Sequence, residues 1–340
     1  MYEKIILLFI IINIPIVFFY KYLVNLINIY DYGDGIRKLQ KRPIALIGGF
    51  ILIYNLSIFF IINTFTILNF YQYFFYTKEY FTFYVGTISF FLVGVYDDKY
   101  QLSAAKKLLI NFFLITFLIL IDKNLVIYEL KFTFMKDTIQ LMNFSYFFSV
   151  LCFLLLINAL NMFDGINLQS GIFCIIIFTI LLVKNLYTGI CFSIILSLIL
   201  FLYYNYKNKG FLGDSGIQVL AFIISYVLIK SYNNTEDVIS IEEIFVLLSF
   251  PGLDMLRLFI FRILNGKNPF KADRNHMHHL ISDKINKNFA IIIIQITIIL
   301  NILFYYFVLN KIIVIFFVIS VYLFLYLCFK KTKEQFEKNI

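Results

Sequence analysis

Charged residues are scarce in this sequence, at 14% of 340 positions, whereas hydrophobic residues make up 61% and the mean hydropathy is +0.87. A balance of this kind excludes an ordinary soluble domain. Histidine is scarcer still. The chain has three, His276, His278 and His279, and all of them fall in the polar stretch NPFKADRNHMHHL, from Asn268 to Leu280. This concentration predicts a functional site there, and the alternative is an ordinary basic surface loop.

Other signals are missing altogether. The sequence has no GxxxxGK loop, so it indicates no ATP-hydrolysing site. No small-residue cleavage site follows the first apolar run, which we interpret as an uncleaved anchor. We find no internal repeat and no soluble segment, and we expect a single integral-membrane domain over residues 1–340. The four cysteines show no metal-ligand spacing and are expected to serve as small hydrophobic residues: Cys152, Cys174, Cys191 and Cys328.

Long apolar runs are what the chain does have. They recur from end to end and predict an all-α polytopic membrane protein with about eleven transmembrane helices. Several runs are shorter than the ~17 residues that a straight span needs, so they must borrow polar flanks or stop inside the bundle. The predicted spans are Ile5–Tyr20, Ile44–Phe65, Phe81–Tyr96, Leu108–Ile121, Phe144–Leu160, Ile172–Val183, Leu186–Tyr204, Ile217–Ile229, Ile241–Met255, Phe289–Leu309 and Ile312–Phe329.

Basic residues set the expected orientation. If the loop after the first span lies inside and the spans alternate, most of the 29 Lys and Arg residues fall in cytosolic segments. The amino terminus is then outside and the carboxy terminus is cytosolic. Orientation and anionic lipid account for much of the net charge of +9, so no nucleic-acid partner is needed.

Two adjacent acids, Asp97 and Asp98, directly follow the third predicted span. The carboxyl end of a helix disfavours carboxylates, so the pair favours a metal-linked or general-base role, with simple solvation as the alternative. Ser103 has the character of an N-cap for the next helix. Lys106 and Lys107 then lie in a first turn where the helix dipole disfavours cations, which indicates an anionic partner.

Amides and a carboxylate end the fifth predicted span. Asn158, Asn161 and Asp164 are three residues apart and share one helical face. Such groups are costly at the end of a membrane span unless they serve a cavity. The set favours contacts to a nucleobase, a ribose or a metal, and a helix C-cap with interhelical hydrogen bonds is the alternative.

A third acid and a first cytosolic loop complete the candidates. Asp214 lies between two glycines in a turn that opens a predicted helix, where it is either a plain cap or a Mg²⁺ ligand. Arg37 and Lys38 are either phosphate contacts or positive-inside anchors, and Gly48 and Gly49 favour close helix packing. All these polar segments, with the histidine stretch, fall on the same predicted inside face, which indicates one cytosolic active site.

Four blocks carry a resemblance: GVYDDKYQLSAAKKLL, NALNMFDGIN, FLGDSG and NPFKADRNHMHHL, with IRKLQKRPIALIGG as a fainter fifth. In this order they resemble the polyprenyl-phosphate N-acetylhexosamine-1-phosphate transferases, the WecA/MraY-type superfamily or glycosyl transferase family 4. The match runs from Asp31 to Leu280. The ADRNHMHHL segment resembles the branch that uses small sugars.

This resemblance implies transfer of an N-acetylhexosamine 1-phosphate from a UDP-sugar, first of all UDP-GlcNAc, to undecaprenyl phosphate with release of UMP. The product would initiate a lipid-linked glycan of the O-antigen, capsule or teichoic-acid type. Mg²⁺ is the implied cofactor, with Mn²⁺ as a substitute. The implied setting is the bacterial cytoplasmic (inner) membrane, with the active site on the cytosolic face, and a homodimer is a further expectation.

The resemblance also implies residue roles. Asp214 is the metal ligand. The catalytic set is Asp97, Asp98, Asp164, His278 and His279, and the substrate-binding set is Arg37, Lys38, Lys107, Asn158, Asn161, Asp273, Arg274 and His276. Asn167 and Leu168 depart from the family, which often has an aspartate and a glycine there, and Gln40 replaces a common histidine.

Two other function classes stay open at this stage. A membrane transporter or channel with a cytosolic polar site is one alternative, although transporters usually place charges near the midplane and show related halves. A polyprenyl-phosphate phosphatase is the other, and it would release free phosphate without a nucleotide.

Overall fold

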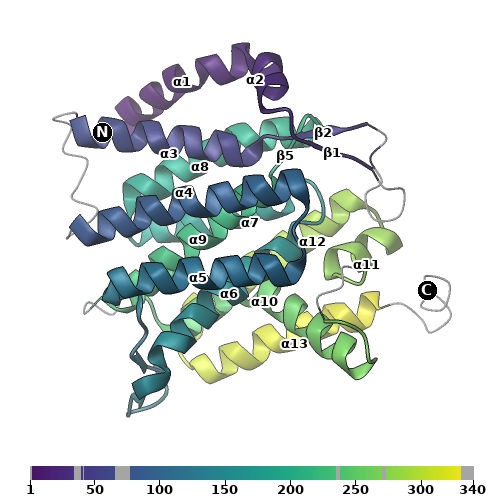
Figure 1. Cartoon of the computed structure of the whole chain (residues 1–340). Helices are drawn as coiled ribbons and strands as arrows, with labels where there is room; N and C mark the ends of the chain where they lie inside the picture. Colours follow the sequence, from purple (N-terminus) through teal and green to yellow (C-terminus); the bar gives the residue numbers. More distant parts are fainter. Residues whose placement is uncertain are drawn as a thin grey trace.

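The chain folds into a bundle of helices (Figure 1). The computed structural model describes residues 2–33, 40, 42–65, 77–234, 238–269 and 273–330. Its α-helices are α1 (Tyr2–Phe18), α2 (Tyr20–Ile27), α3 (Gly48–Phe65), α4 (Thr77–Tyr100), α5 (Ala104–Ile121), α6 (Ser145–Phe163), α7 (Gln169–Val183), α8 (Thr188–Tyr206), α9 (Gly213–Tyr232), α10 (Ile241–Leu264), α11 (Met277–Lys284), α12 (Lys287–Phe307) and α13 (Lys311–Phe329).

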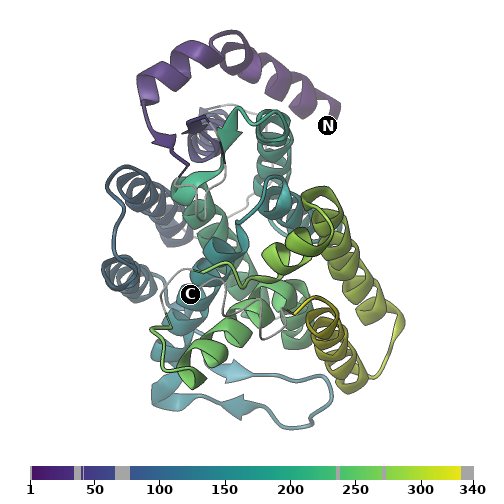
Figure 2. The same cartoon turned by 90° about the vertical axis from the view of Figure 1, so that its right-hand side faces the viewer.

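Short strands, which the apolar pattern did not predict, lie at the two ends of the bundle. At one end β2 (Ile44–Leu46) pairs with β1 (Tyr30–Asp31) in antiparallel register and with β5 (Gly210–Phe211) in parallel register. This sheet lies near α11, and Figure 2 views the bundle from that end. A hairpin of β3 (Glu129–Leu130) and β4 (Ile139–Gln140) lies between α5 and α6.

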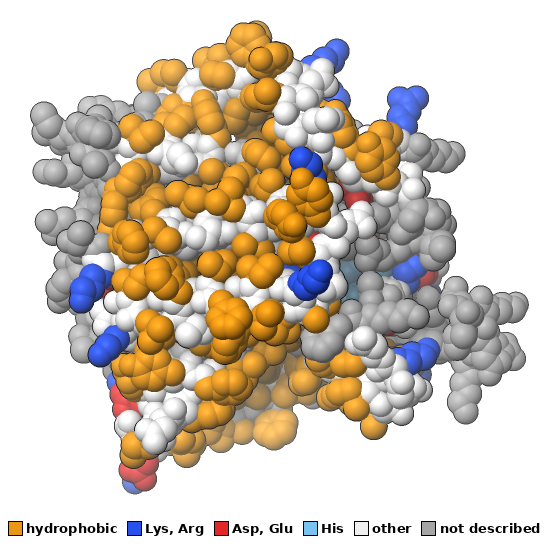
Figure 3. Space-filling view, viewed as in Figure 1, with side chains coloured by type: hydrophobic (Ala, Val, Ile, Leu, Met, Phe, Trp, Pro, Cys, Tyr) orange, Lys and Arg blue, Asp and Glu red, His pale blue; other side chains and the backbone are white. Residues whose placement is uncertain are grey.

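The structure supports a polytopic membrane protein. Among the described residues, eight helices are long and apolar enough to cross a membrane, or up to nine if a bent pair counts as one span. Gly48–Ile61 and Gln169–Val183 are apolar but shorter, so the eleven spans stay a prediction. Figure 3 shows a broad apolar face, with Lys and Arg side chains toward its edges.

Several predicted boundaries are wrong. The second predicted span begins at Ile44, but Ile44–Leu46 is a strand and α3 begins at Gly48, and the ninth, Ile241–Met255, stops short of the end of α10 at Leu264. The first span was predicted to run from Ile5 to Tyr20, but the helix α1 ends earlier, at Phe18, where the chain turns by 70° into α2. The third span was predicted to end at Tyr96, but the helix α4 continues to Tyr100. Asp97 and Asp98 therefore lie in the last turn of a helix rather than after it, and their partners, described below, come from other elements.

Helix α9 runs through the centre of the bundle and is almost wholly buried. Glycines let two neighbours approach its first turn at backbone distance. A Cβ on Gly49 in α3 would lie 2.8 Å from the amide nitrogen of Gly216, and a Cβ on Gly94 in α4 would lie 2.3 Å from the Cα of Ser215. The close packing predicted at Gly49 is confirmed, and it fixes the helix turn that carries Asp214.

A buried ion cluster lies where α4 begins and α9 ends, at the opposite end of this helix pair from Asp214. The Lys230 ammonium on α9 lies 2.8 Å from Glu79 on α4 and 2.6 Å from Asp122, the residue after α5. All three side chains are buried, with at most 6% of each exposed. A buried charge is tolerated only when it is paired, so this lysine holds two carboxylates that would otherwise be costly.

Replacing Lys230 should therefore destabilise the protein strongly. Lys230→Met removes the ammonium group that pairs with both buried carboxylates, and removal of one partner from a buried pair typically costs about 3–5 kcal/mol. We expect a clear fall in the melting temperature of the detergent-purified protein. Lys131→Met is the control, because Lys131 pairs with Glu129 at the surface and such pairs contribute little. Equal melting temperatures for the two variants would contradict this account.

Candidate active site

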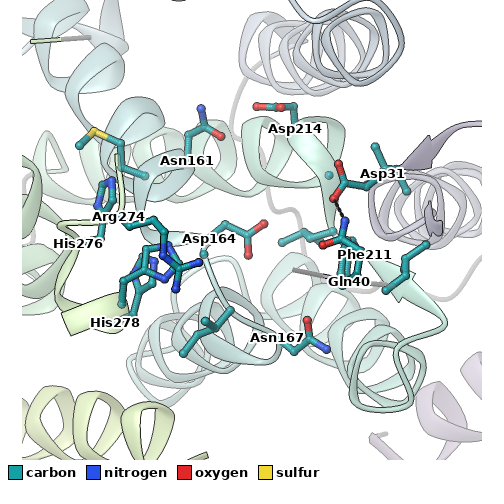
Figure 4. Close-up of a pocket in the computed structure, with 18 of the residues that line it drawn as sticks. Asp31, Gln40, Asn161, Asp164, Asn167, Phe211, Asp214, Arg274, His276 and His278 are labelled. Atoms are coloured by element: carbon teal, nitrogen blue, oxygen red, sulfur yellow. Dashed lines mark hydrogen bonds between the residues drawn. The ribbon is translucent and has the colours of Figure 1, made fainter. Parts of the chain in front are cut away.

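A cavity of about 960 Å³ opens at the end of the bundle that carries the three-stranded sheet and α11. Polar side chains from several helices converge on it (Figure 4). The predicted site residues among its lining are Asp97, Asp98, Asn158, Asn161, Asp164, Asp214, Asp273, Arg274, His276, His278 and His279. Segments far apart in the sequence thus form one site. Arg37 and Lys38 lie outside the described residues.

A lysine joins two of the predicted acids. The ammonium group of Lys107 on α5 lies 2.6 Å from Asp97 Oδ2 and also contacts Asp214 Oδ1. The other oxygen of Asp97 accepts a hydrogen bond of 2.7 Å from the amide of Leu102. The anionic partner expected for Lys107 therefore includes two carboxylates of the chain itself. The cation lets Asp97 and Asp214 lie together in spite of their like charge.

Asn161 completes this cluster from α6. With its amide oriented for hydrogen bonding, the NH₂ group donates to Asp214 Oδ1 at 2.9 Å and the oxygen accepts from Lys107 at 3.1 Å. Asn158, one turn earlier, donates instead to the carbonyl of Leu154 in its own helix at 2.8 Å. Both amides line the cavity, but only Asn161 contacts the acids.

Asp98 has a different task from its neighbour. Its two carboxylate oxygens accept hydrogen bonds from the amides of Asp214 and Ser215, at 2.7 and 3.0 Å. These amides belong to the first turn of α9, whose own N-cap residue, Leu212, provides no side-chain hydrogen bond. Asp98 on α4 therefore caps α9 from a neighbouring helix. Gly213, with φ +74°, makes room for the carboxylate, since a Cβ there would lie 2.7 Å from Asp98 Oδ2.

Asp164 is a further acid of the cavity lining. It is the residue after α6, and its Oδ1 accepts a hydrogen bond from the Ser170 hydroxyl. Burial raises the pKa of Asp164 to about 6, the negative charge of Asp214 adds to the rise, and the Ser170 hydrogen bond opposes it. A carboxyl group with such a pKa exchanges a proton near neutral pH.

Glycine after Asp164 makes room for a histidine. A Cβ on Gly165 would lie 1.8 Å from Nε2 of His278, so no larger residue fits at this position without moving the imidazole. The ring of His278 is 1% exposed, and its Nδ1 lies 3.5 Å from the Gln169 amide nitrogen. Its Nε2 is buried and has no hydrogen-bond partner among the described residues.

The histidine stretch is partly helical. His276 precedes α11, and His278 and His279 lie in its first turn. Burial lowers the pKa of His278 well below its usual value and that of His279 to about 3, and the nearby Arg274 lowers both further. These two imidazoles are therefore neutral at physiological pH.

Two ion pairs order the loop before this helix. Asp273 Oδ2 accepts a hydrogen bond of 3.0 Å from Arg262 Nε, and its Oδ1 accepts one of 2.8 Å from the Asn275 amide. Although burial opposes the shift, the Arg262 pair lowers the pKa of Asp273. Arg274 donates to Asp283 at 3.1 Å. Asp273, predicted to bind substrate, thus uses both oxygens within the protein.

Sequence reasoning missed Asp254. This carboxylate on α10 is 3% exposed and binds the start of the histidine helix: its Oδ1 accepts from the Met277 amide at 3.1 Å, and its Oδ2 lies 3.2 Å from His276 Nδ1. A signal was available, since an acid in the middle of an apolar membrane helix is by default a functional candidate. Sequence reasoning also missed the Arg262 guanidinium on the same helix, which pairs with Asp273.

The positions that depart from the family are integrated into the local structure. Asn167 donates to the Asn205 carbonyl at 3.0 Å and to Asn208 Oδ1 at 2.6 Å. Leu168 adopts φ +69°, a left-handed conformation that glycine adopts without strain. Gln40 donates to Asp31 Oδ2 at 2.6 Å beside the cavity. At position 167 a hydrogen-bonding amide thus replaces the acid that is common in the family. At position 168 leucine replaces the common glycine and adopts a left-handed backbone conformation that is strained for leucine.

Asp214 suits a Mg²⁺ ligand. Mg²⁺ is usually held by one or two carboxylates together with substrate phosphates and water, so a preformed cage is not required. Asp214 lines the cavity, its side chain is 29% exposed, and its Oδ2 accepts no hydrogen bond from the described residues. Among those residues no group of three or more His, Cys, Asp or Glu forms a metal site by itself. The acid therefore fits a cation that arrives with a phosphate ligand.

The neutral histidines predict a pH dependence of stability. Unfolded histidine binds a proton below about pH 6.5, whereas His278 and His279 do not in the folded protein, so stability falls as the pH drops. At about pH 5.5 the loss is on the order of 1.4 kcal/mol for each histidine. Asp164 acts in the opposite direction, because its pKa is raised on folding.

The measurement is the melting temperature between about pH 7.5 and pH 5.5 for the wild type and for His278→Gln/His279→Gln. We expect the wild type to lose more stability on acidification than the double variant. A variant with the same or a steeper pH dependence would contradict the assignment of neutral imidazoles.

Comparison with known proteins gives consistent matches. The family model described as glycosyl transferase family 4 matches residues 80–232. The chain is 32% identical over 203 residues to the probable undecaprenyl-phosphate N-acetylglucosaminyl 1-phosphate transferase of Bacillus subtilis, covering 57% of this chain and 56% of the relative. It is 27% identical over 200 residues to the undecaprenyl-phosphate alpha-N-acetylglucosaminyl 1-phosphate transferase of Escherichia coli O157:H7, covering 56% of this chain and 54% of the relative.

The chain thus spans just over half the length of these relatives. The segment matched by the family model contains Asp97, Lys107, Asn161, Asp164 and Asp214, which the fold brings to one cavity. The matched segment, the matching relatives and the motif order thus make this part of the chain similar to glycosyl transferase family 4.

Proposed function

We propose that this protein transfers an N-acetylhexosamine 1-phosphate from a UDP-sugar, with UDP-GlcNAc as the first expectation, to undecaprenyl phosphate and releases UMP. The observation that carries the proposal is the cluster of Asp97, Lys107 and Asp214 at the cavity. Phosphoryl transfer mainly needs positioning and charge neutralisation, and this cluster offers both. The names of the bacterial relatives support the acceptor and the sugar.

The bonds that change are few. An oxygen of the acceptor phosphate attacks the phosphorus next to the sugar, the bond from that phosphorus to the oxygen of UMP breaks, and a lipid-linked pyrophosphate results. Asp97 engages the acceptor phosphate as a base or as a positioning group. Lys107, released from a carboxylate, is close enough to neutralise the incoming phosphate. Asp98 acts indirectly, because it fixes the turn that carries Asp214.

The remaining residues are assigned to the donor. Asn158, Asn161 and Asp164 would contact the nucleotide, and His276, His278 and His279 with Arg274 would contact the sugar and its phosphates. Mg²⁺ on Asp214, or Mn²⁺ in its place, would neutralise the donor pyrophosphate. A compact polar site rejects donors that lack its hydrogen-bonding groups more sharply than it rejects apolar bulk, so the choice among N-acetylated hexoses is the least constrained part of the proposal.

The proposed setting is the bacterial cytoplasmic membrane, with the cavity on the cytosolic face, an outside amino terminus and a cytosolic carboxy terminus. The concentration of Lys and Arg in alternate loops supports this orientation. The lipid-linked product would begin a cell-envelope glycan. We also propose that the protein forms a homodimer.

The test of the activity uses purified protein with undecaprenyl phosphate, Mg²⁺ and either UDP-GlcNAc or the muramyl-pentapeptide nucleotide. We expect release of UMP and a lipid-linked sugar from the N-acetylhexosamine donor. Asp214→Asn should abolish both products, because the amide lacks the charge, and Asp97→Asn should lower the rate by orders of magnitude. Asp137→Asn, an exposed acid near the β3–β4 hairpin, is the matched control and should keep full activity.

Transfer from the muramyl-pentapeptide donor without transfer from any UDP-N-acetylhexosamine would refute the donor assignment. Near-normal Mg²⁺-dependent activity of Asp214→Asn would refute the role of this acid.

Orientation is tested separately by labelling single cysteines in a background whose four native cysteines are replaced by alanine. Lys209 and Asp137 are both exposed. Lys209 directly precedes β5 and Asp137 lies between β3 and β4, and these strands lie at opposite ends of the bundle. In intact cells, an impermeant maleimide should label Asp137→Cys but not Lys209→Cys, and lysis should make both reactive. Labelling of Lys209→Cys in intact cells would place the site end outside and contradict the proposal.

A further inference from the structure

Asp254 is an acid outside the cluster of Asp97, Lys107 and Asp214 whose two oxygens are both engaged. Its Oδ1 accepts three hydrogen bonds: 2.7 Å from the Arg257 guanidinium, 2.9 Å from the Tyr322 hydroxyl and 3.1 Å from the Met277 amide. Three donors directed at one oxygen, one of them the Arg257 guanidinium, stabilise the ionised form of the carboxyl group. Arg257 supplies the compensating charge within the same helix.

The second oxygen is committed to His276. Asp254 Oδ2 lies 3.2 Å from His276 Nδ1, and an ionised carboxylate can only accept a hydrogen bond. The Nδ1 atom must therefore carry a proton. Nε2 is then the nitrogen of His276 left for a ligand, and this side chain lines the cavity.

The surroundings of His276 provide no competing acid at this distance among the described residues. His278 stacks on it with ring centroids 5.4 Å apart, and His279 lies 6.4 Å away edge to face. Asp273, on the loop before it, uses its oxygens on Arg262 and Asn275. Tyr322, from α13, reaches His276 only through Asp254. The orientation and tautomer of the imidazole thus depend on one carboxylate.

We propose that Asp254 is a positioning residue of the transfer reaction. By holding the Nδ1 proton of His276 it leaves Nε2 as an acceptor, directed to a hydroxyl group of the donor sugar. This inference rests on the proposed function for the identity of that ligand. An acid that orients a histidine in this way fixes which nitrogen is available, and loss of such an outer partner typically costs roughly 10- to 100-fold in activity at comparable sites.

A purely structural role is the competing explanation, because Asp254 also caps α11. Met277 is the first residue of that helix, and its amide donates to Asp254, whereas the N-cap residue His276 provides no side-chain cap. The experiment must therefore separate an effect through His276 from a general effect on the loop.

The first measurement is a double-mutant cycle on kcat/KM for the donor, with Asp254→Asn, His276→Gln and the double variant. Asp254→Asn should lose roughly 10- to 100-fold. The double variant should lose no more than the worse single variant, because Asp254 acts through a side chain that is already absent. Losses that multiply would overturn the proposal. Ser249→Ala, a buried polar change on the same helix whose hydroxyl bonds only within α10, is the control and should keep wild-type activity.

The second measurement does not depend on activity. The chain has three histidines, so ¹⁵N-histidine labelling in lipid nanodiscs gives three pairs of ring signals, and His276→Gln identifies the pair of His276. In the wild type, Nδ1 of His276 should be protonated, and in Asp254→Asn the proton should move to Nε2. An unprotonated Nδ1 in the wild type would overturn the proposal even if every Asp254 variant failed to fold.

The two measurements also separate the inference from the function on which it rests. A protonated Nδ1 together with no transfer from any nucleotide donor would refute the proposed function and leave the pairing of Asp254 with His276 intact. Normal transfer with an unprotonated Nδ1 would refute the inference alone.

Discussion

Helix amino termini capped from outside are the constraint on which this site depends. The first turns of α9 and α11 carry Asp214 and the histidine pair, and neither helix has a side-chain cap of its own. Asp98 from α4 and Asp254 from α10 supply the missing acceptors. A carboxylate at such a terminus also meets the positive end of the helix dipole. Each functional helix therefore begins where a neighbouring helix holds it.

This arrangement divides the acids by task. Asp97 and Asp98 are adjacent, yet Asp97 pairs with Lys107 beside the cavity, whereas both oxygens of Asp98 accept hydrogen bonds from backbone amides. The difference follows from helical geometry, because neighbouring residues on a helix point about 100° apart. Glycines at 49 and 94 allow α3 and α4 to approach α9 at backbone distance. The position of Asp214 thus depends on packing and capping together.

The sequence was informative where the signal is local. The shared face of Asn158, Asn161 and Asp164 and the cap at Ser103 follow from spacing alone, and the structure has both. Pairings between distant segments were not accessible in the same way. Asp254 lies within an apolar run and Tyr322 lies 68 positions later, so only the packing of α10 against α13 reveals their contact. The helical part of the histidine stretch was also missed, because α11 is short and polar and its cap comes from another helix.

The paired ends of α4 and α9 have a mechanical consequence. A lysine holds two carboxylates at each end of this antiparallel pair, Lys107 beside the cavity and Lys230 at the opposite end. Sliding one helix past the other by a single turn, about 5.4 Å, would break both clusters at once. The ion clusters therefore hold α4 and α9 in a fixed position relative to each other. A movement that widens the cavity would come from the segments that surround this pair.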